Sequence, residues 1–301
     1  MNWLFIAIIA HFLFALVFIV DKFIVSKTAL QPVAYAFYTG LLQIFVLVLI
    51  PFGFKIPPLE QIIISFIAGA LFTFAVLFLY KSFQLGQVSR IAPVIGGSVP
   101  IFTLILTYSF LGERLTFYQL IAFCLFVLGG IIILWPQKEA LQTIQSSLSK
   151  RLFIVFLSAL LFAGSFVLTK FIFTHQPFIN GFIWIRLGGV LGTILLFFWP
   201  GNIQRILEAA KIVKIRTIGV FSANKSLSAV AFILLNYAIF LGSVSLVNAL
   251  QGIQYVFLLI IIAILSKKFP EIIKEKISNR IVAQKIIAIL FIALGLGILM
   301  F

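Results

Sequence analysis

The chain alternates between long apolar runs and short polar gaps. A helix that crosses the hydrocarbon core of a bilayer needs about 20 mostly apolar residues, and it must satisfy its backbone hydrogen bonds within the segment. Ten runs meet this requirement, over residues 3–25, 33–52, 61–83, 91–111, 117–135, 152–173, 178–199, 217–241, 246–265 and 281–301. The pattern predicts an all-α polytopic membrane protein with ten transmembrane helices.

Composition supports this reading and excludes other classes of protein. Of 301 residues, 63% are hydrophobic and 10% are charged, whereas soluble domains are about half apolar and about a quarter charged. These values exclude a soluble enzyme, a disordered chain and a nucleic-acid-binding domain. No Lys or Arg precedes the first apolar run, so we expect a retained helix rather than a cleaved signal. The one cysteine, Cys124, lies in an apolar run without metal-ligand spacing, so we expect no disulfide, metal or cofactor.

The two halves of the chain share short sequence matches. An LGxVS segment begins at Leu85 and again at Leu241, 156 residues later, and Gln119 and Gln284 match at an offset of 165. These matches divide the chain into a first five-helix repeat over 1–135, a connector over 136–151 and a second five-helix repeat over 152–301. Because five is odd, the second repeat must enter the membrane from the opposite side. The pattern predicts two inverted repeats, an architecture typical of secondary transporters that bind solute near the midplane.

The sequence also resembles a known family. Ala92-Pro93 and Pro100 in the fourth predicted helix, followed by the stretch Gly112 to Thr116, are similar to the pattern of the drug/metabolite transporter superfamily, and of its EamA-like branch in particular. In the second half the Gly-Glu pair is lost, and Lys274 to Ser278 is the nearest echo. The resemblance implies a secondary transporter of small organic solutes, and it does not identify the solute.

Basic residues predict the orientation in the membrane. Seventeen lysines and arginines lie at the odd-numbered gaps, and three, Lys55, Arg114 and Lys170, lie at the even-numbered gaps. Since short cytoplasmic loops carry the excess of Lys and Arg, we expect a cell-membrane protein with odd-numbered loops in the cytoplasm and both termini outside. Ten-helix members of the family are usually drawn with both termini inside, so the two arguments disagree.

Two cations lie inside predicted helices. Arg186 and Lys225 are each the ninth residue of their run, and ionisable groups within the membrane are functional candidates by default. Facing a cavity, either could bind a carboxylate or phosphate, and arginine could do so with two parallel hydrogen bonds. The alternative is that each side chain reaches the interface or bonds to backbone carbonyls. His11 could titrate in a coupling step or be a packed, hydrogen-bonded histidine.

Uncharged polar residues complete the predicted site. No carboxylate is centred in any predicted helix, which favours an anionic, zwitterionic or neutral solute over a cationic drug. Amides and small residues could line a cavity or could hold helices together. The predicted substrate-binding residues are Arg186, Lys225, Asn236, Asn248, Gln251, Tyr255, Tyr38, Pro93 and Gly97, with His11 as the coupling candidate and no catalytic residue.

These features predict a secondary transporter that moves an amino acid, another zwitterion or an organic anion by alternating access. The expected partners are a small-molecule solute and the lipid bilayer, without nucleic acid. One alternative is a non-transporting structural or regulatory membrane protein, and another is a membrane-embedded transferase, which would need clustered carboxylates or a nucleophile with a base. The solute, the direction of transport, the coupling ion and the oligomeric state, for which a monomer is one option, are open at this point.

Overall fold

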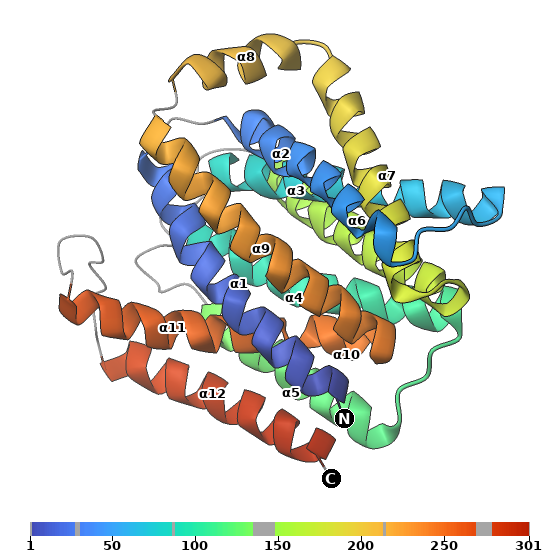
Figure 1. Ribbon diagram of the computed structural model, residues 1–301. Helices are drawn as coiled ribbons and strands as arrows, with labels where there is room; N and C mark the ends of the chain where they lie inside the picture. Colours follow the sequence, from blue (N-terminus) through green and yellow to red (C-terminus); the bar gives the residue numbers. More distant parts are fainter. Residues whose placement is uncertain are drawn as a thin grey trace.

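The computed structural model describes residues 2–27, 31–85, 88–134, 148–212, 215–268 and 279–300, and within these ranges every regular element is a helix. Figure 1 shows them as one bundle, with the start of α1 and the end of α12 at the same end. The elements are α1 (Asn2–Lys27), α2 (Pro32–Leu41), η1 (Leu42–Phe52), α3 (Leu59–Leu85), α4 (Val88–Leu106), η2 (Thr107–Leu111), α5 (Phe117–Leu134), α6 (Leu148–His175), α7 (Phe178–Phe198), α8 (Asn202–Ile212), α9 (Ile215–Leu241), α10 (Val244–Ala249), α11 (Gln251–Lys268) and α12 (Asn279–Met300).

The described residues hold nine helical spans that are long and apolar enough to cross a membrane. Three of these spans join two elements, namely α2 with η1, α4 with η2, and α10 with α11. The predicted fifth helix corresponds to α5, whose apolar stretch, Phe117–Ile132, is shorter than the nine. The prediction of an all-α membrane protein is therefore confirmed, and the described residues hold nine long spans and one shorter apolar helix where ten spans were predicted.

The connector after α7 is a helix of its own. α8 lies across the end of the bundle (Figure 1) and packs on α2 and α7. Its buried residues, Asn202, Ile206 and Ala209, recur at helical spacing, while Arg205 and Glu208 are exposed. This separation of faces is that of an amphipathic surface helix.

Glycines bring the backbones of α3 and α7 into contact. A Cβ added at Gly69 on α3 would collide with the carbonyl oxygen of Ile185, and one added at Gly188 on α7 would lie 2.7 Å from that of Phe66. Small residues permit such close approach between membrane helices. The interface between α3 and α7 is therefore sealed by backbone contact and has no room for solute.

The second span is irregular. Its first half, α2, is α-helical, but η1 continues as a 3-10 helix of 11 residues with Pro51 inside it. Runs of 3-10 helix beyond 3–4 residues are uncommon, and a stretch within a helix often marks a hinge. η1 packs against α7 and presents Phe45 and Val48 as exposed side chains.

Lys170 joins α6 to the end of α9. Its Nζ donates hydrogen bonds to the carbonyl oxygens of Ile239 at 2.8 Å, Phe240 at 3.3 Å and Gly242 at 2.7 Å. The last carbonyls of a helix have no partner within it, and a cation is favourable at that end. Lys170 thus caps α9 from a neighbouring helix.

Candidate solute-binding cavity

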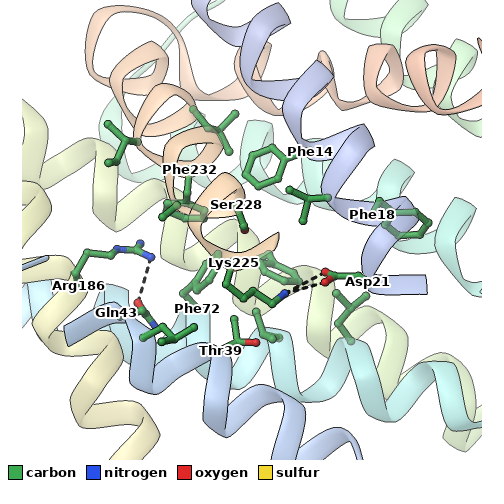
Figure 2. A pocket seen from close by; sticks show the side chains of 18 of the residues that line it. Phe14, Phe18, Asp21, Thr39, Gln43, Phe72, Arg186, Lys225, Ser228 and Phe232 are labelled. Atoms are coloured by element: carbon green, nitrogen blue, oxygen red, sulfur yellow. Dashed lines mark hydrogen bonds and ion pairs between the residues drawn. The ribbon is translucent and has the colours of Figure 1, made fainter. Parts of the chain in front are cut away.

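The centre of the bundle contains a cavity of about 1160 Å³, which is large enough for a small organic molecule. Its walls come from α1, α2, η1, α3, α4, α6, α7, α9, α10 and α11, and they are mostly apolar and aromatic. Figure 2 shows the part of the wall that carries charge, where Arg186 points to Gln43 and Lys225 points to Asp21. Both cations predicted from the sequence therefore face the same cavity.

Arg186 lies on α7 and is 7% exposed. Among the residues that the structure describes, its guanidinium makes one hydrogen bond, from Nη1 to Oε1 of Gln43 at 3.1 Å. Its Nε is buried and has no hydrogen-bond partner there. An arginine has five donors, so the hydrogen-bonding capacity and the charge of Arg186 remain available to a ligand.

Three aromatic rings surround this guanidinium. Its central carbon lies 4.2 Å from the ring centre of Phe232, 5.2 Å from that of Phe72 and 5.4 Å from that of Phe182. A cation over an aromatic ring is attracted by about 0.5–2 kcal/mol, depending on its desolvation. The rings hold the guanidinium in the cavity without neutralising it, so an anion remains its best additional partner.

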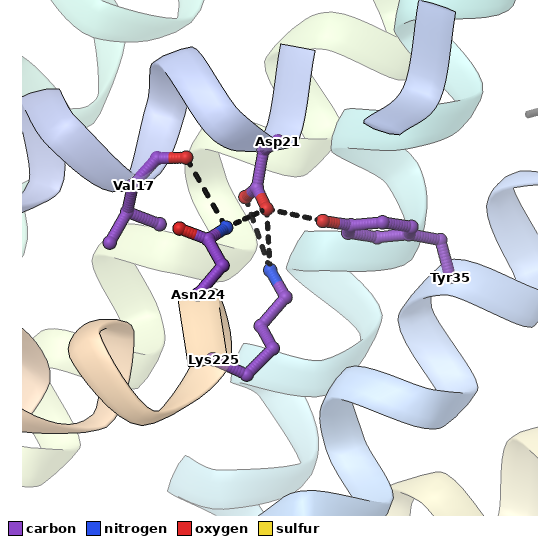
Figure 3. Close-up of polar contacts among 5 residues, drawn as sticks. All are labelled: Val17, Asp21, Tyr35, Asn224 and Lys225. Atoms are coloured by element: carbon purple, nitrogen blue, oxygen red, sulfur yellow. Dashed lines mark hydrogen bonds and ion pairs between the residues drawn. The ribbon is translucent and has the colours of Figure 1, made fainter. Parts of the chain in front are cut away.

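Lys225 is neutralised by a carboxylate. Its Nζ lies 3.0 Å from Oδ1 and 3.1 Å from Oδ2 of Asp21 on α1. Asn224 donates from Nδ2 to Oδ1 of Asp21 at 2.7 Å, and the hydroxyl of Tyr35 on α2 donates to the same oxygen. Figure 3 shows this network, which joins α1, α2 and α9.

The expectation of an interior without carboxylates is therefore wrong. Asp21 lies at the end of the first membrane span, Asn2–Asp21, as its place late in the predicted run 3–25 implies, but its side chain lines the cavity. The charges of Arg186, Lys225 and Asp21 add up to one positive charge. Lys225 lies seven residues before Phe232, the ring nearest Arg186, which is a rise of about 10.5 Å along α9. Arg186 and Lys225 therefore lie against different turns of α9.

His11 lines the cavity at a different place. Its Nε2 lies 3.2 Å from the carbonyl oxygen of Val247 on α10, while its Nδ1 is buried with no hydrogen-bond partner among the described residues. His11 therefore links α1 to α10.

Three further predicted residues line the cavity on α10 and α11: Asn248, Gln251 and Tyr255. The Nδ2 of Asn248 donates to Oγ1 of Thr103 at 3.3 Å, and Nε2 of Gln251 donates to the hydroxyl of Tyr255 at 3.3 Å. A Cβ added at Gly96 would lie 2.7 Å from that hydroxyl. Asn248, Gln251 and Tyr255 therefore form a polar part of the cavity wall on α10 and α11.

Three of the remaining predicted residues, Asn236, Tyr38 and Gly97, are not among the described residues that line the cavity. Asn236 donates from Nδ2 to the carbonyl of Phe232 at 2.8 Å, and Tyr38 donates to the carbonyl of Ile206 on α8 at 3.1 Å. Gly97 faces Ile131 of α5, where an added Cβ would lie 2.8 Å away. Pro93 belongs to α4, and its side chain lies outside the described residues.

Known proteins resemble this chain in sequence and in fold. The model of the EamA-like transporter family matches residues 1–135. Over these residues, a little under half of the chain, the sequence is similar to the EamA-like transporter family. A crystal structure of a protein aligns with 99% of this chain and 97% of its own, with a TM-score of 0.69 and 14% sequence identity. At this identity the likeness shows the fold alone, but it extends over both halves. No curated protein sequence matches the chain.

The match confirms the predicted resemblance, and with it a membrane protein of a transporter family. The EamA-like transporter family is generally non-enzymatic. Among the described residues, no group of three His, Cys, Asp or Glu side chains could hold a metal ion.

The predicted site residues did not include three residues that lie around the two cations: Asp21, Tyr35 and Gln43. A usable signal existed for Gln43, because it is a lone polar residue in the apolar stretch Leu41-Leu42-Gln43-Ile44, whereas Asp21 is followed directly by Lys22. Polar side chains in membrane helices tend to face the protein interior. Nothing local, however, indicates which cation each would meet, because Lys225 lies 204 residues from Asp21 and Arg186 lies 143 residues from Gln43.

Proposed function

We propose that this protein is a secondary transporter whose preferred solute is a small organic molecule with one net negative charge. The observation that carries the proposal is Arg186, a buried cation in a 1160 Å³ cavity whose described partners include no carboxylate. A buried charge without a counter-ion is costly, and a carboxylate on the solute would supply that counter-ion. Because Asp21 already neutralises Lys225, one negative charge makes the occupied cavity neutral.

We further propose that the two halves are inverted repeats. In this correspondence α1 is equivalent to α6, α2 with η1 to α7, α3 to α9, and α4 to α10 with α11. The packing of α1 on α9 then has its counterpart in the packing of α3 on α6, and both occur. The packing of α4 on α6 likewise has its counterpart in that of α11 on α1. These paired interfaces support a twofold relation between the halves.

One pair of interfaces breaks the relation, and this supports alternating access. α3 packs closely on α7 through Gly69 and Gly188, but extended packing of α2 on α9 does not occur among the described residues. Those two helices approach through side chains, where Lys225 lies 4.7 Å and the Phe221 ring 5.6 Å from the ring centre of Tyr35. The cavity lies between them. In the opposite state the α2–α9 interface would close and the α3–α7 interface would open.

Uptake into liposomes tests the proposed solute class. Purified protein should accumulate at least one labelled monocarboxylate from a panel of aliphatic, aromatic and amino-acid compounds, each compared with its primary amide. The variant Arg186→Gln should lose the preference for the acid over the amide. Uptake of a quaternary ammonium compound with no uptake of any carboxylate would contradict the proposal.

Thiol labelling tests alternating access. In a Cys124→Ala background, Ser228→Cys on the cavity wall should react with a water-soluble thiol reagent, and solute should protect it. Thr73→Cys, buried in the α3–α7 interface where the native hydroxyl donates to the carbonyl of Gly189 at 3.0 Å, should react only during turnover. If Thr73→Cys stays unreactive during turnover, the proposed opposite state is wrong. A cysteine added after Phe301 should label in intact cells if both termini lie outside, as the basic residues predict.

A further inference from the structure

The side chain of Gln43 extends from η1 to α7. Its Oε1 accepts the one described hydrogen bond of Arg186, at 3.1 Å (Figure 2). The contact joins η1 to α7, and both Gln43 and Arg186 line the cavity. Among the described residues, Gln43 is therefore the hydrogen-bond partner that positions Nη1 of Arg186.

α7 is shaped to receive this side chain. A Cβ added at Gly189 would collide with the carboxamide group of Gln43. Gly189 lies three residues after Arg186, so the two residues share one face of α7. Gln43 thus lies against a position without a side chain, directly beside the arginine that it contacts. Unlike the collision at Gly69, this one involves the end of a flexible side chain and not backbone.

The two cations of the cavity have acceptors of opposite kind. Lys225 contacts a carboxylate, and Arg186 contacts a carboxamide. Both acceptors orient their cation, but only the carboxylate cancels its charge. Glutamate in place of Gln43 would have the same length and would form a charge-assisted pair with Arg186, which is about twice as strong as a neutral hydrogen bond.

We propose that Gln43 determines the charge specificity of transport. It orients Arg186 through one hydrogen bond and, because it is neutral, leaves the positive charge to the carboxylate of the solute. Gln43 is a positioning residue in this scheme, and the solute contacts Arg186. The inference rests on the proposed function and deepens it, since it explains why one cation of the cavity binds solute and the other does not.

The decisive variant is Gln43→Glu, compared with wild type for binding and uptake of each monocarboxylate and its matched amide. Glutamate would supply the counter-ion internally, so we expect the affinity for the carboxylate to fall by at least about 100-fold, while the amide binds as well as before or better. The thermal midpoint without solute should not fall, because a new ion pair forms, and this measurement excludes a folding defect.

Two matched variants separate local contact from other effects. Gln31→Glu adds the same charge to an exposed position of the same cavity wall, where solvent screens it, and should reduce the preference for the acid much less than Gln43→Glu does. Gly189→Ala should push the carboxamide of Gln43 away without adding charge, so the affinity should change while the acid is still preferred over the amide.

The possible results separate the role of Gln43 from the solute class of the cavity. If wild type prefers the acid and Gln43→Glu does so equally, or if Gln31→Glu abolishes the preference as completely as Gln43→Glu, then Gln43 does not set specificity and the proposed function stands. If Gly189→Ala reverses the preference, geometry rather than charge decides, and the inference is also wrong. If wild type binds no carboxylate of the panel, the proposed function fails and this inference fails with it.

Discussion

Replacing Asp21 by asparagine would leave Lys225 as a buried cation without a counter-ion. At a separation of 3.0 Å the attraction between the two charges is about 5.5 kcal/mol with an effective dielectric constant of about 20. The cost of removing both groups from water offsets much of this attraction, and breaking such a pair from one side costs about 3–5 kcal/mol. Because the Asp21 side chain is 19% exposed, we expect the lower end, about 3 kcal/mol.

A double-mutant cycle in detergent measures this interaction. Asp21→Asn and Lys225→Met should each lower the free energy of unfolding, and the thermal midpoint should fall by roughly 5–10 °C for Asp21→Asn. The double variant should lose less than the sum of the two, because it leaves neither charge behind. Lys211→Gln, which removes an exposed charge on α8, is the matched control and should change the midpoint little.

Transport gives a second, independent measure of the same variant. Asp21→Asn raises the sum of the three cavity charges from one positive to two positive. Uptake of a dicarboxylate should therefore rise relative to that of a monocarboxylate of similar size. The expected coupling in the cycle and the expected rise in dicarboxylate uptake both require that Asp21 neutralises Lys225. Strict additivity together with an unchanged ratio of the two solutes would therefore refute the reasoning.

Three further substitutions test single features of the fold and the site. Arg186→Lys keeps the charge but loses the planar fork and its contact with the ring of Phe232, so initial uptake of carboxylate should fall at least about tenfold; equal uptake would mean that a point charge suffices. Lys170→Met removes three hydrogen bonds at the end of α9 and should cost roughly 2–3 kcal/mol in thermal or denaturant unfolding, with partial recovery in Lys170→Arg. Gly69→Ala forces the backbones of α3 and α7 apart and should lower the thermal midpoint, whereas Gly297→Ala, where an added Cβ meets nothing within 4 Å, should leave it unchanged or slightly raised.

The helices could be predicted well because their signal is local. Apolar length alone placed the span that became α7 within one residue, 178–199 against Phe178–Phe198, since every backbone group in a bilayer must be bonded within its own helix. The irregular parts were not predictable in this way. η1 and α2 were expected as one regular helix, and nothing in the apolar run 33–52 distinguishes a 3-10 from an α-helical backbone.

The site was predicted in part, and the reason is again physical. Arg186 and Lys225 could be identified because a charge in an apolar run is conspicuous and costly. The difference between a neutralised Lys225 and an unneutralised Arg186 could not be predicted. It depends on Asp21 and Gln43, which contact the two cations only after helices distant in sequence pack together. Asn236 and Lys225 were both expected to bind substrate, yet Asn236 donates a hydrogen bond to the backbone carbonyl of Phe232 in its own helix. Helical periodicity thus gives the face of a residue and not its partner.

The 3-10 backbone of η1 also makes the second span a segment of adjustable length. A 3-10 helix rises about 2.0 Å per residue and an α-helix about 1.5 Å, so the 11 residues of η1 would shorten by about 5.5 Å on conversion to α-helix. That is one α-helical turn, the size of step by which packed helices move past one another in switching proteins. Gln43 is the second residue of η1, so its contact with Arg186 lies at the junction with α2, where such a change of helical pitch would begin.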